Sequence, residues 1–162
     1  MSAPANPLRL QVLDRIVAVL KTITAGADYF YTPKVEKRFI HWAEAKYFPT
    51  YMVFPGSGGH IEIKSTQNYD EDMIVSIKGI VKDSIDPGSI IEKCLCDIRR
   101  AIDIDSRSGA AGTLGVLAVE TAFEEGPTTD DGYLSLEGFG FFDQPLRVKI
   151  GLGSNYGNPQ ED

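Results

Sequence analysis

The stretch MIVSIKGIVK at residues 73–82, followed by DPGSIIEKCLCDIRRAI at residues 86–102, decides the fold class. Apolar side chains alternate with polar ones in the first segment, which predicts a strand with one buried face. The second segment opens with Asp86 and Pro87 and carries an apolar stripe at helical spacing. That stripe consists of Ile90, Ile91, Cys94, Leu95, Ile98 and Ile102. A strand and a helix that are each apolar on one side pack those sides together, so we expect a helix-on-sheet layer.

A further amphipathic helix is predicted near the N-terminus. Asn6 followed by Pro7 is a favourable helix start, because asparagine caps helices and proline suits the first turn. Gly26 is a suitable C-terminal stop. Between them apolar residues recur at steps of three and four, namely Leu10, Leu13, Ile16, Val17, Leu20 and Ile23.

Strand-like segments fill much of the remaining chain. They cover residues 29–42, 50–54, 60–64, 117–124, a segment from 134, and 146–152, with Ile61 and Ile63 on one side of the third. This order predicts an α+β fold: one mainly antiparallel sheet with two helices packed on one face. We expect long hairpins at 55–60 and 126–132 to protrude, and a flexible loop at 105–113. Residues 1–162 form a single domain, with an N-terminal arm at 1–6 and a C-terminal tail at 153–162.

Composition and charge narrow the function classes. Of the 162 residues, 43% are hydrophobic, which is enough for a core, and the net charge is −7. Residues 1–54 carry +3, residues 55–108 carry −3 and residues 109–162 carry −7. The acidic last third argues against wrapping nucleic acid. The asymmetry suits identical subunits packed head to tail, with a solvated acidic surface as the alternative.

Membrane association and secretion are not expected. No segment has the roughly 20 apolar residues of a membrane span. The N-terminus lacks the basic and then apolar pattern of a signal peptide. The sequence therefore predicts a soluble chain that stays in the cytoplasm when it is made.

Metal and cofactor binding are not expected either. His41 and His60 are the only histidines, and neither has a matching ligand nearby in the sequence. Asp103 and Asp105 begin a segment similar to a calcium loop, but its sixth and twelfth positions hold serine and leucine instead of glycine and glutamate. The glycines at 56–59 and 109–115 precede predicted strands, so we interpret them as turns rather than phosphate cradles.

The sequence offers only a weak arrangement for nucleophilic catalysis. Ser57 and His60 lie near each other in a predicted turn, but no acidic residue is placed to orient the histidine. A small hydrolase that uses these two residues stays an open alternative. Cys94 and Cys96 point to sides of the predicted helix about 200° apart, so no bridge between them is expected. We therefore expect that the protein is not an enzyme.

Aromatic residues are concentrated in the segment 29–54. They are Tyr29, Phe30, Tyr31, Phe39, Trp42, Tyr47, Phe48, Tyr51 and Phe54. A single small sheet can bury only about half of them, and the rest would suit a protein–protein interface, where tyrosine, tryptophan and phenylalanine are enriched.

The order of these elements resembles that of the tail terminator, or tail-completion, proteins of long-tailed bacteriophages. The resemblance lies in a first helix that ends near LKTI at 20–23, then YFYTPKVEKR at 29–38 and FPTYMVF at 48–54. A polar hairpin, a strand, a second helix and closing strands follow. The resemblance implies a structural role without cofactor or turnover. It implies a hexameric ring that caps the head-proximal end of the tail tube, stops its polymerisation and joins the tail to the head connector.

Such a ring would place the chain in the neck of the virion, after assembly in the host cytoplasm, against copies of itself, the tube protein and the connector. A closed ring needs two different complementary patches on each subunit. We expect Lys37 and Arg38 to meet Asp130 and Asp131 across the subunit boundary. Further interface candidates are Trp42, Ser57, His60 and Arg107. A neck connector ring and a tail-tube or baseplate-hub subunit are the alternatives.

Overall fold

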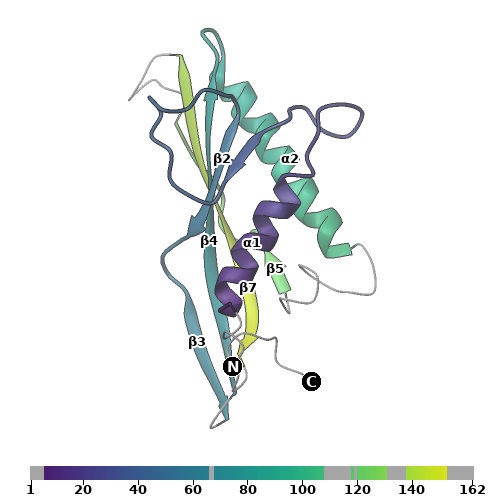
Figure 1. Ribbon diagram of the computed structural model, residues 1–162, viewed down its shortest axis with the longest axis vertical. Coiled ribbons are helices and arrows are strands. Elements are labelled where there is room, and N and C mark those ends of the chain that lie inside the picture. Colours follow the sequence, from purple (N-terminus) through teal and green to yellow (C-terminus); the bar gives the residue numbers. More distant parts are fainter. Residues whose placement is uncertain (1–5, 66–67, 108–117, 119, 131–137, 153–162) are drawn as a thin grey trace, which may run out of the picture.

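The computed structural model describes residues 6–65, 68–107, 118, 120–130 and 138–152, which form one seven-stranded sheet with two helices on one face (Figure 1). The elements are α1 (Leu8–Leu20), β1 (Lys34–Glu36), β2 (Thr50–Pro55), β3 (His60–Ser65), β4 (Asn68–Lys82), α2 (Pro87–Arg107), β5 (Glu120–Ala122), β6 (Thr128–Asp130) and β7 (Phe139–Leu152). Only the β1–β2 pair is parallel among these strands. The α+β fold with a mainly antiparallel sheet is therefore confirmed.

Two long strands form the centre of the sheet. β4 and β7 pair antiparallel from Tyr69 opposite Leu152 to Lys82 opposite Phe139. Short strands occupy both outer edges of this ribbon: β2 and β3 pair with β4, while β5 and β6 pair with β7. The β4–β7 ribbon thus fixes the position of every other strand except β1, which pairs with β2.

The helices cover the face of the sheet that the alternation in β4 predicts. Met73, Val75, Ile77 and Val81 are almost fully buried, and they pack in one cluster with apolar residues of α1 and α2. The helical residues at the centre of that cluster include Ile16, Leu20, Ile91, Leu95 and Ile98. Burying a branched apolar side chain contributes about 1.5–3 kcal/mol, so this layer supplies most of the stabilising free energy.

Gly79 interrupts the apolar side chains on the buried side of β4, and the structure gives its reason. Gly79 pairs with Tyr51 on one side and Phe142 on the other. The two rings meet edge to face with centroids 5.8 Å apart. A Cβ built at Gly79 would lie 2.1 Å from the ring of Phe142. Glycine is therefore required here because the rings occupy the space that any side chain would need.

Among the described residues, the second face of the sheet is covered at the end where β2 lies. The connection between β1 and β2 crosses to this face, where Ile40, Met52 and Ile80 form a small buried cluster. Phe48, Phe54, Phe139 and Phe141 pack around it. The predicted strand at 29–42 is therefore wrong except for β1, because most of this segment packs through its side chains rather than through a strand ladder.

Several predicted boundaries differ from the structure. The first helix ends at Leu20 rather than near Gly26, and its N-cap is Pro7, without a side-chain cap from Asn6. The second helix extends to Arg107 into the expected loop at 105–113, whose remaining residues lie outside the described part. The last strand starts at Phe139 instead of Leu146. The second helix is longer than expected because the β4–β7 ribbon continues alongside it. The last strand is longer because it pairs with β4 as far as Phe139 opposite Lys82.

The expected hairpin at 55–60 is also different. Residues 56–59 link β2 to β3, and both strands pair with β4 rather than with each other. The Gly56 N–H donates to the Ile74 carbonyl, and a Cβ at Gly59 would lie 2.7 Å from the Asp72 carbonyl oxygen, so the link runs close along β4. The hairpin that extends past the helices is β3 with the start of β4 (Figure 1).

The remaining expectations fall partly outside the described residues. In the hairpin expected at 126–132, residues Thr128–Asp130 form β6 along β7, and 131–132 are not described. The strand expected at 117–124 is reduced to β5 in the described part. The segment from 134, the arm at 1–5 and the tail at 153–162 lie outside the described residues.

A buried carboxylate joins the segment after α1 to α2. Asp97 is 1% exposed and accepts hydrogen bonds from the backbone N–H groups of Phe30, at 3.0 and 3.1 Å, and Tyr31, at 3.2 Å. On the surface beside it, Arg100 pairs with Asp28 at 3.0 Å. The Asp97 carboxylate thus accepts hydrogen bonds from two backbone N–H groups, and the same hydrogen bonds stabilise its buried charge.

We expect Gly79→Ala to lower the free energy of unfolding by about 2 kcal/mol, because the new methyl group forces the Phe142 ring out of position. Urea denaturation followed by circular dichroism measures this. Gly126→Ala is the matched control, since a Cβ there meets nothing within 4 Å. Equal stability of Gly79→Ala and the parent chain would contradict the packing described.

Asp97→Ala is expected to lower the free energy of unfolding by about 1–3 kcal/mol, because it leaves the N–H groups of Phe30 and Tyr31 without their acceptor. The same denaturation assay applies, with the exposed Glu92→Ala on α2 as control. Amide exchange at Phe30 and Tyr31 should accelerate in Asp97→Ala alone. Unchanged exchange there would show that Asp97 does not anchor the segment.

Candidate subunit interface

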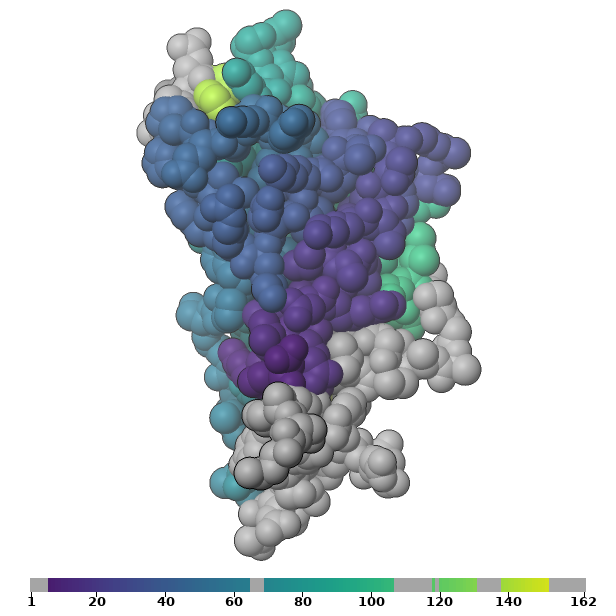
Figure 2. Space-filling model, in the orientation of Figure 1, coloured from purple at the N-terminus to yellow at the C-terminus, as the bar shows by residue number. Residues whose placement is uncertain are grey.

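An aromatic surface lies on the second face of the sheet. It consists of Phe39, Trp42, Tyr47, Phe48, Phe54, Phe139 and Phe141. Phe39 is 63% exposed, Tyr47 64% and Trp42 41%. The connection between β1 and β2, which carries four of these residues, is dark blue and lies at the upper left in Figure 2. Large aromatic side chains gathered at this exposure are typical of protein-binding surfaces.

The rings are held in place by contacts with one another. Trp42 packs edge to face on Phe139 with ring centroids 5.8 Å apart, and Phe48 packs on the same ring at 5.8 Å. The Ile40 N–H donates a hydrogen bond to the Met52 sulfur at 3.1 Å, and this bond holds the segment between β1 and β2 against β2. Packing against neighbouring rings therefore fixes the orientation of the Trp42, Phe48 and Phe139 side chains in the aromatic surface.

A small apolar pocket opens in the aromatic surface. Its volume is about 130 Å³. Its lining residues are Phe39, Ile40, His41, Trp42, Met52, Lys78, Gly79, Ile80, Phe141 and Phe142. An apolar pocket of this size accepts an apolar group. The pocket can therefore receive one apolar side chain of a partner.

Lysines lie over the rings around this pocket. Lys82 lies 5.5 Å from the centroid of Phe139 and 5.9 Å from that of Phe48, while Lys78 lies 5.2 Å from that of Phe54. Lys34 lies 5.3 Å from the centroid of Tyr47. Each such contact is worth about 0.5–1 kcal/mol at an exposed site. They give the apolar surface a positive border.

The predicted interface residues fall into separate groups. Trp42 belongs to the aromatic surface. Lys37 forms an ion pair with Asp14 on α1, and Arg38 next to it is exposed. The expected pairing of these two cations with Asp130 and Asp131 of another subunit stays a prediction.

Of the two acidic interface candidates, Asp130 lies within the described residues and Asp131 does not. Asp130 ends β6 opposite Phe141, so it lies at the same end of the sheet as the aromatic surface. Asp131 lies outside the described residues, and so does the side chain of Arg107, the last residue of α2.

Ser57 and His60 lie elsewhere, in the link to β3 and at its first residue, and both are exposed. Among the residues that the structure describes, no hydrogen bond joins their side chains. No group of three or more His, Cys, Asp or Glu side chains in the described ranges is placed to hold a metal ion. No helix in the described part of the chain is long and apolar enough to cross a membrane.

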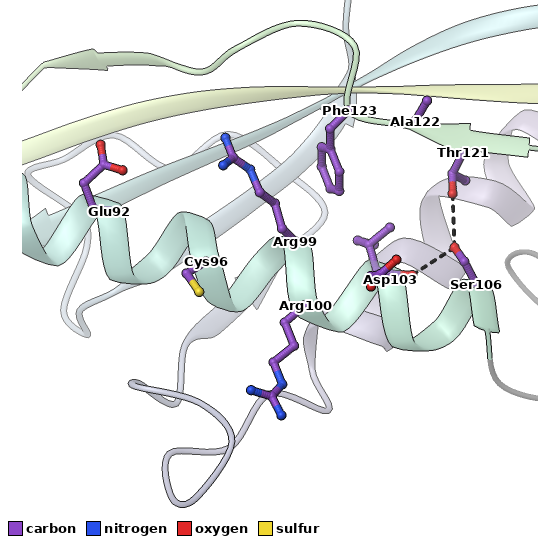
Figure 3. Close-up of a pocket in the computed structure, with 10 residues that line it drawn as sticks. Glu92, Cys96, Arg99, Arg100, Asp103, Ser106, Thr121, Ala122 and Phe123 are labelled. Carbon is purple, nitrogen blue, oxygen red and sulfur yellow. Dashed lines mark hydrogen bonds between the residues drawn. The ribbon is translucent and has the colours of Figure 1, made fainter.

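A groove of about 720 Å³ lies on the other face, between α2 and the segment of β5 (Figure 3). Its lining residues include Glu92, Cys96, Arg99, Asp103, Ser106, Thr121 and Phe123. Arg99 donates to the buried Gln144 at 3.1 Å, and the Ser106 and Thr121 hydroxyls lie 3.2 Å apart. The Ser106–Thr121 contact joins α2 to β5, and the Arg99–Gln144 hydrogen bond joins α2 to β7.

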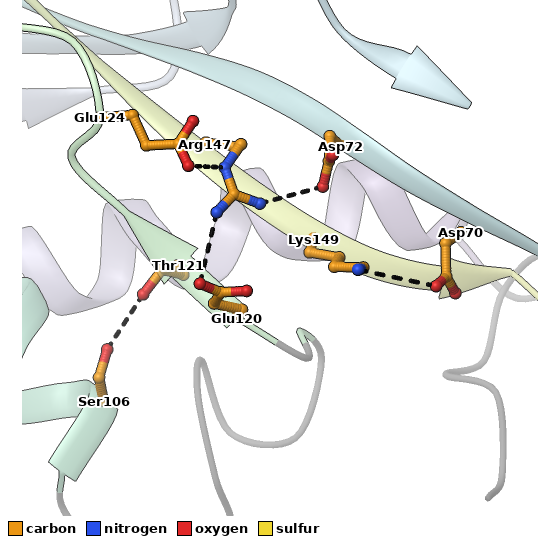
Figure 4. Close-up of polar contacts among 8 residues, drawn as sticks. All are labelled: Asp70, Asp72, Ser106, Glu120, Thr121, Glu124, Arg147 and Lys149. Atoms are coloured by element: carbon orange, nitrogen blue, oxygen red, sulfur yellow. Dashed lines mark hydrogen bonds and ion pairs between the residues drawn. The ribbon is translucent and has the colours of Figure 1, made fainter. Parts of the chain in front are cut away.

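The rest of the second face is charged. Arg147 on β7 forms ion pairs with Asp72 at 3.2 Å, Glu120 at 3.3 Å and Glu124 at 2.8 Å (Figure 4). Lys149 lies 4.0 Å from Asp70 on the same face. The second face thus has an aromatic half and a charged half.

Sequence reasoning missed Lys78, Lys82, Phe139 and Phe141. Their signal was present as period-two alternation, because the even positions of β4 and the odd positions of β7 share one face. That alternation was visible only if the last strand began at Phe139.

A comparison with models of known protein families and a search of curated proteins found no match for the chain.

The two cysteines differ in environment. Cys94 is buried beside Tyr51, and burial raises the pKa of its thiol to about 12. Burial likewise raises the pKa of Tyr51 far above its usual value. Cys96, two residues further on, is exposed. Both are free.

We expect the folded protein at pH 8 to react rapidly with one equivalent of a thiol reagent, at Cys96. A raised pKa keeps Cys94 protonated and therefore unreactive at that pH. Unfolding in guanidinium should release the second thiol. Cys96→Ser is the control and should show no rapid reaction. Rapid modification of Cys94 in the folded chain would contradict its buried position.

Proposed function

We propose that this chain is a self-associating structural subunit of a phage tail, which forms a ring at the head-proximal end of the tail tube. The observation that carries the proposal is the aromatic surface, which combines Phe39, Trp42 and Tyr47 with an apolar pocket. Exposed aromatic side chains around an apolar pocket gain free energy when a protein partner covers them.

The order of the elements supports the same proposal. The sequence α1, β1, β2, β3, β4, α2, β5, β6 and β7 has the helix, short strands, hairpin, long strand, helix and closing strands on which the resemblance to tail terminators rests. A hairpin that extends beyond the helices is suited to contact the ring above or below. The chain would act by binding and not by turnover.

The distribution of charge suits a head-to-tail ring. The aromatic surface has a positive border of lysines, and the last third of the sequence is strongly acidic. Two different complementary patches give a head-to-tail contact, which closes into a ring when the rotation between subunits allows it. Complementary charges also set the register of such a contact.

Native mass measurement and electron microscopy of the purified chain test this proposal. We expect discrete rings, hexameric by the resemblance, that bind one end of tails lacking their terminator and stop tube growth. Phe39→Ser should raise the concentration at which rings dissociate about tenfold, which corresponds to about 1.4 kcal/mol. Ile104→Ser, at an exposed isoleucine on α2, is the matched control and should assemble normally.

Other outcomes would contradict the proposal. A chain that stays monomeric at every concentration has no ring to form. Open-ended tubes from the purified chain would identify a tube subunit instead. Rings that bind only the portal side would identify a neck connector.

A further inference from the structure

Ile85 is the most exposed of the large apolar side chains in the described part of the chain, at 90%. It lies in the turn between β4 and α2, at the end of the molecule that is uppermost in Figure 1. A fully solvated isoleucine at the tip of a turn has no role in the core. It is, however, well placed to enter a cavity on another molecule.

The turn that carries Ile85 is held by its own hydrogen bonds. The Asp83 carboxylate accepts from the Ile85 N–H at 2.9 Å, and the Asp83 N–H donates to the Gly138 carbonyl at 2.9 Å. The Asp86 carboxylate accepts from the N–H of Ser89 at 3.2 Å and from its hydroxyl at 2.5 Å. Ile85 therefore projects from an ordered turn, so docking it costs little conformational entropy.

The size and polarity of the pocket in the aromatic surface suit such a side chain. The pocket is apolar and has a volume of about 130 Å³, which is enough for one branched aliphatic group. It lies on the second face of the sheet, whereas Ile85 lies in the turn beyond the end of β4. Because Ile85 is exposed in its own chain, it does not fill the pocket of that chain.

The charges nearest the two features differ in sign, acidic beside Ile85 and basic at the pocket, where Lys78 also lies 3.8 Å from Asp143 of its own chain. Asp83 and Asp86 flank Ile85, and the hydrogen bonds from Ser89 lower the pKa of Asp86. Lys78 lines the pocket, and Lys82 lies over the rings of Phe48 and Phe139 next to it. An acidic turn and a pocket bordered by lysines attract each other in one orientation.

We propose that Ile85 of one copy inserts into the aromatic pocket of a second copy, as the head-to-tail contact of the ring. This inference rests on the self-association proposed above. The apolar insertion supplies affinity, and the pairing of Asp83 and Asp86 with Lys78 and Lys82 sets the direction. Each subunit contributes its turn to one neighbour and its pocket to the other, as a closed ring requires.

Cross-linking tests the contact directly. In a Cys96→Ser chain, which keeps only the buried Cys94, the exposed neighbours of the two features are replaced: Ser84→Cys beside Ile85 and Ala43→Cys beside Trp42, together or in separate chains. A short bis-maleimide should link the doubly substituted chain into a ladder up to the size of the ring. A mixture of the two single variants should give cross-linked dimers only, and each single variant alone should give none.

The single tryptophan provides a second readout, because Trp42 lines the pocket. Assembly should shift its fluorescence emission to shorter wavelength. Ile85→Ser should abolish this shift and raise the dissociation concentration about tenfold or more. Ile104→Ser is the matched control and should behave as the parent chain. Circular dichroism checks that each variant folds.

The outcomes separate this inference from the proposed function. Rings that form normally in Ile85→Ser and give no ladder would overturn the inference while the ring stands. A ladder that stops at the dimer would show a reciprocal contact and overturn the head-to-tail arrangement. A Trp42 shift that appears only when tail tubes are added would assign the pocket to the tube protein and overturn the inference. A parent chain that never assembles would overturn the proposed function itself.

Discussion

The contact between Tyr51 and Phe142 over Gly79 fixes the register on which the rest of the structure depends. Because side chains alternate between the two faces of a strand, this register also places Ile80 opposite Phe141 on the second face. A slip of one residue would turn the apolar set of β4 away from the helices and expose it. The same constraint therefore builds the helical core on one face and the aromatic surface on the other.

The two faces have different physical roles. The helix face holds the core, with residues such as Val75 and Leu146 fully buried, and it accounts for folding. The second face divides into the aromatic surface and the charged half around Arg147. The partly solvated ion pairs of Arg147 contribute little to stability, typically about 0–1 kcal/mol each. The free energy available for binding lies in the aromatic surface, and this is why the proposed ring contact is placed there.

The sequence predicted elements whose pattern is local and missed those set by distant partners. The alternation in β4 and the stripes of α1 and α2 were visible because one residue period defines each of them. Residues 29–42 are as aromatic as a strand, but Tyr29 and Tyr31 pack against the core on the helix side. Phe39, Ile40 and Trp42 pack on the second face. Among the interface candidates, Trp42 lies on the aromatic surface, whereas Lys37 pairs within the chain with Asp14. No local pattern shows which partner a solvated lysine will take.

Hydrogen–deuterium exchange of the assembled and the dissociated protein tests the central claim most directly, since it locates the contact without altering the chain. The claim is that this fold acts through its second face and the turn beyond β4. Protection on assembly should appear in peptides covering 39–48 and 83–86, while the exposed side of α2 stays unchanged. Assembly that protects α2 and leaves both of those segments as exchangeable as in the free chain would contradict the account.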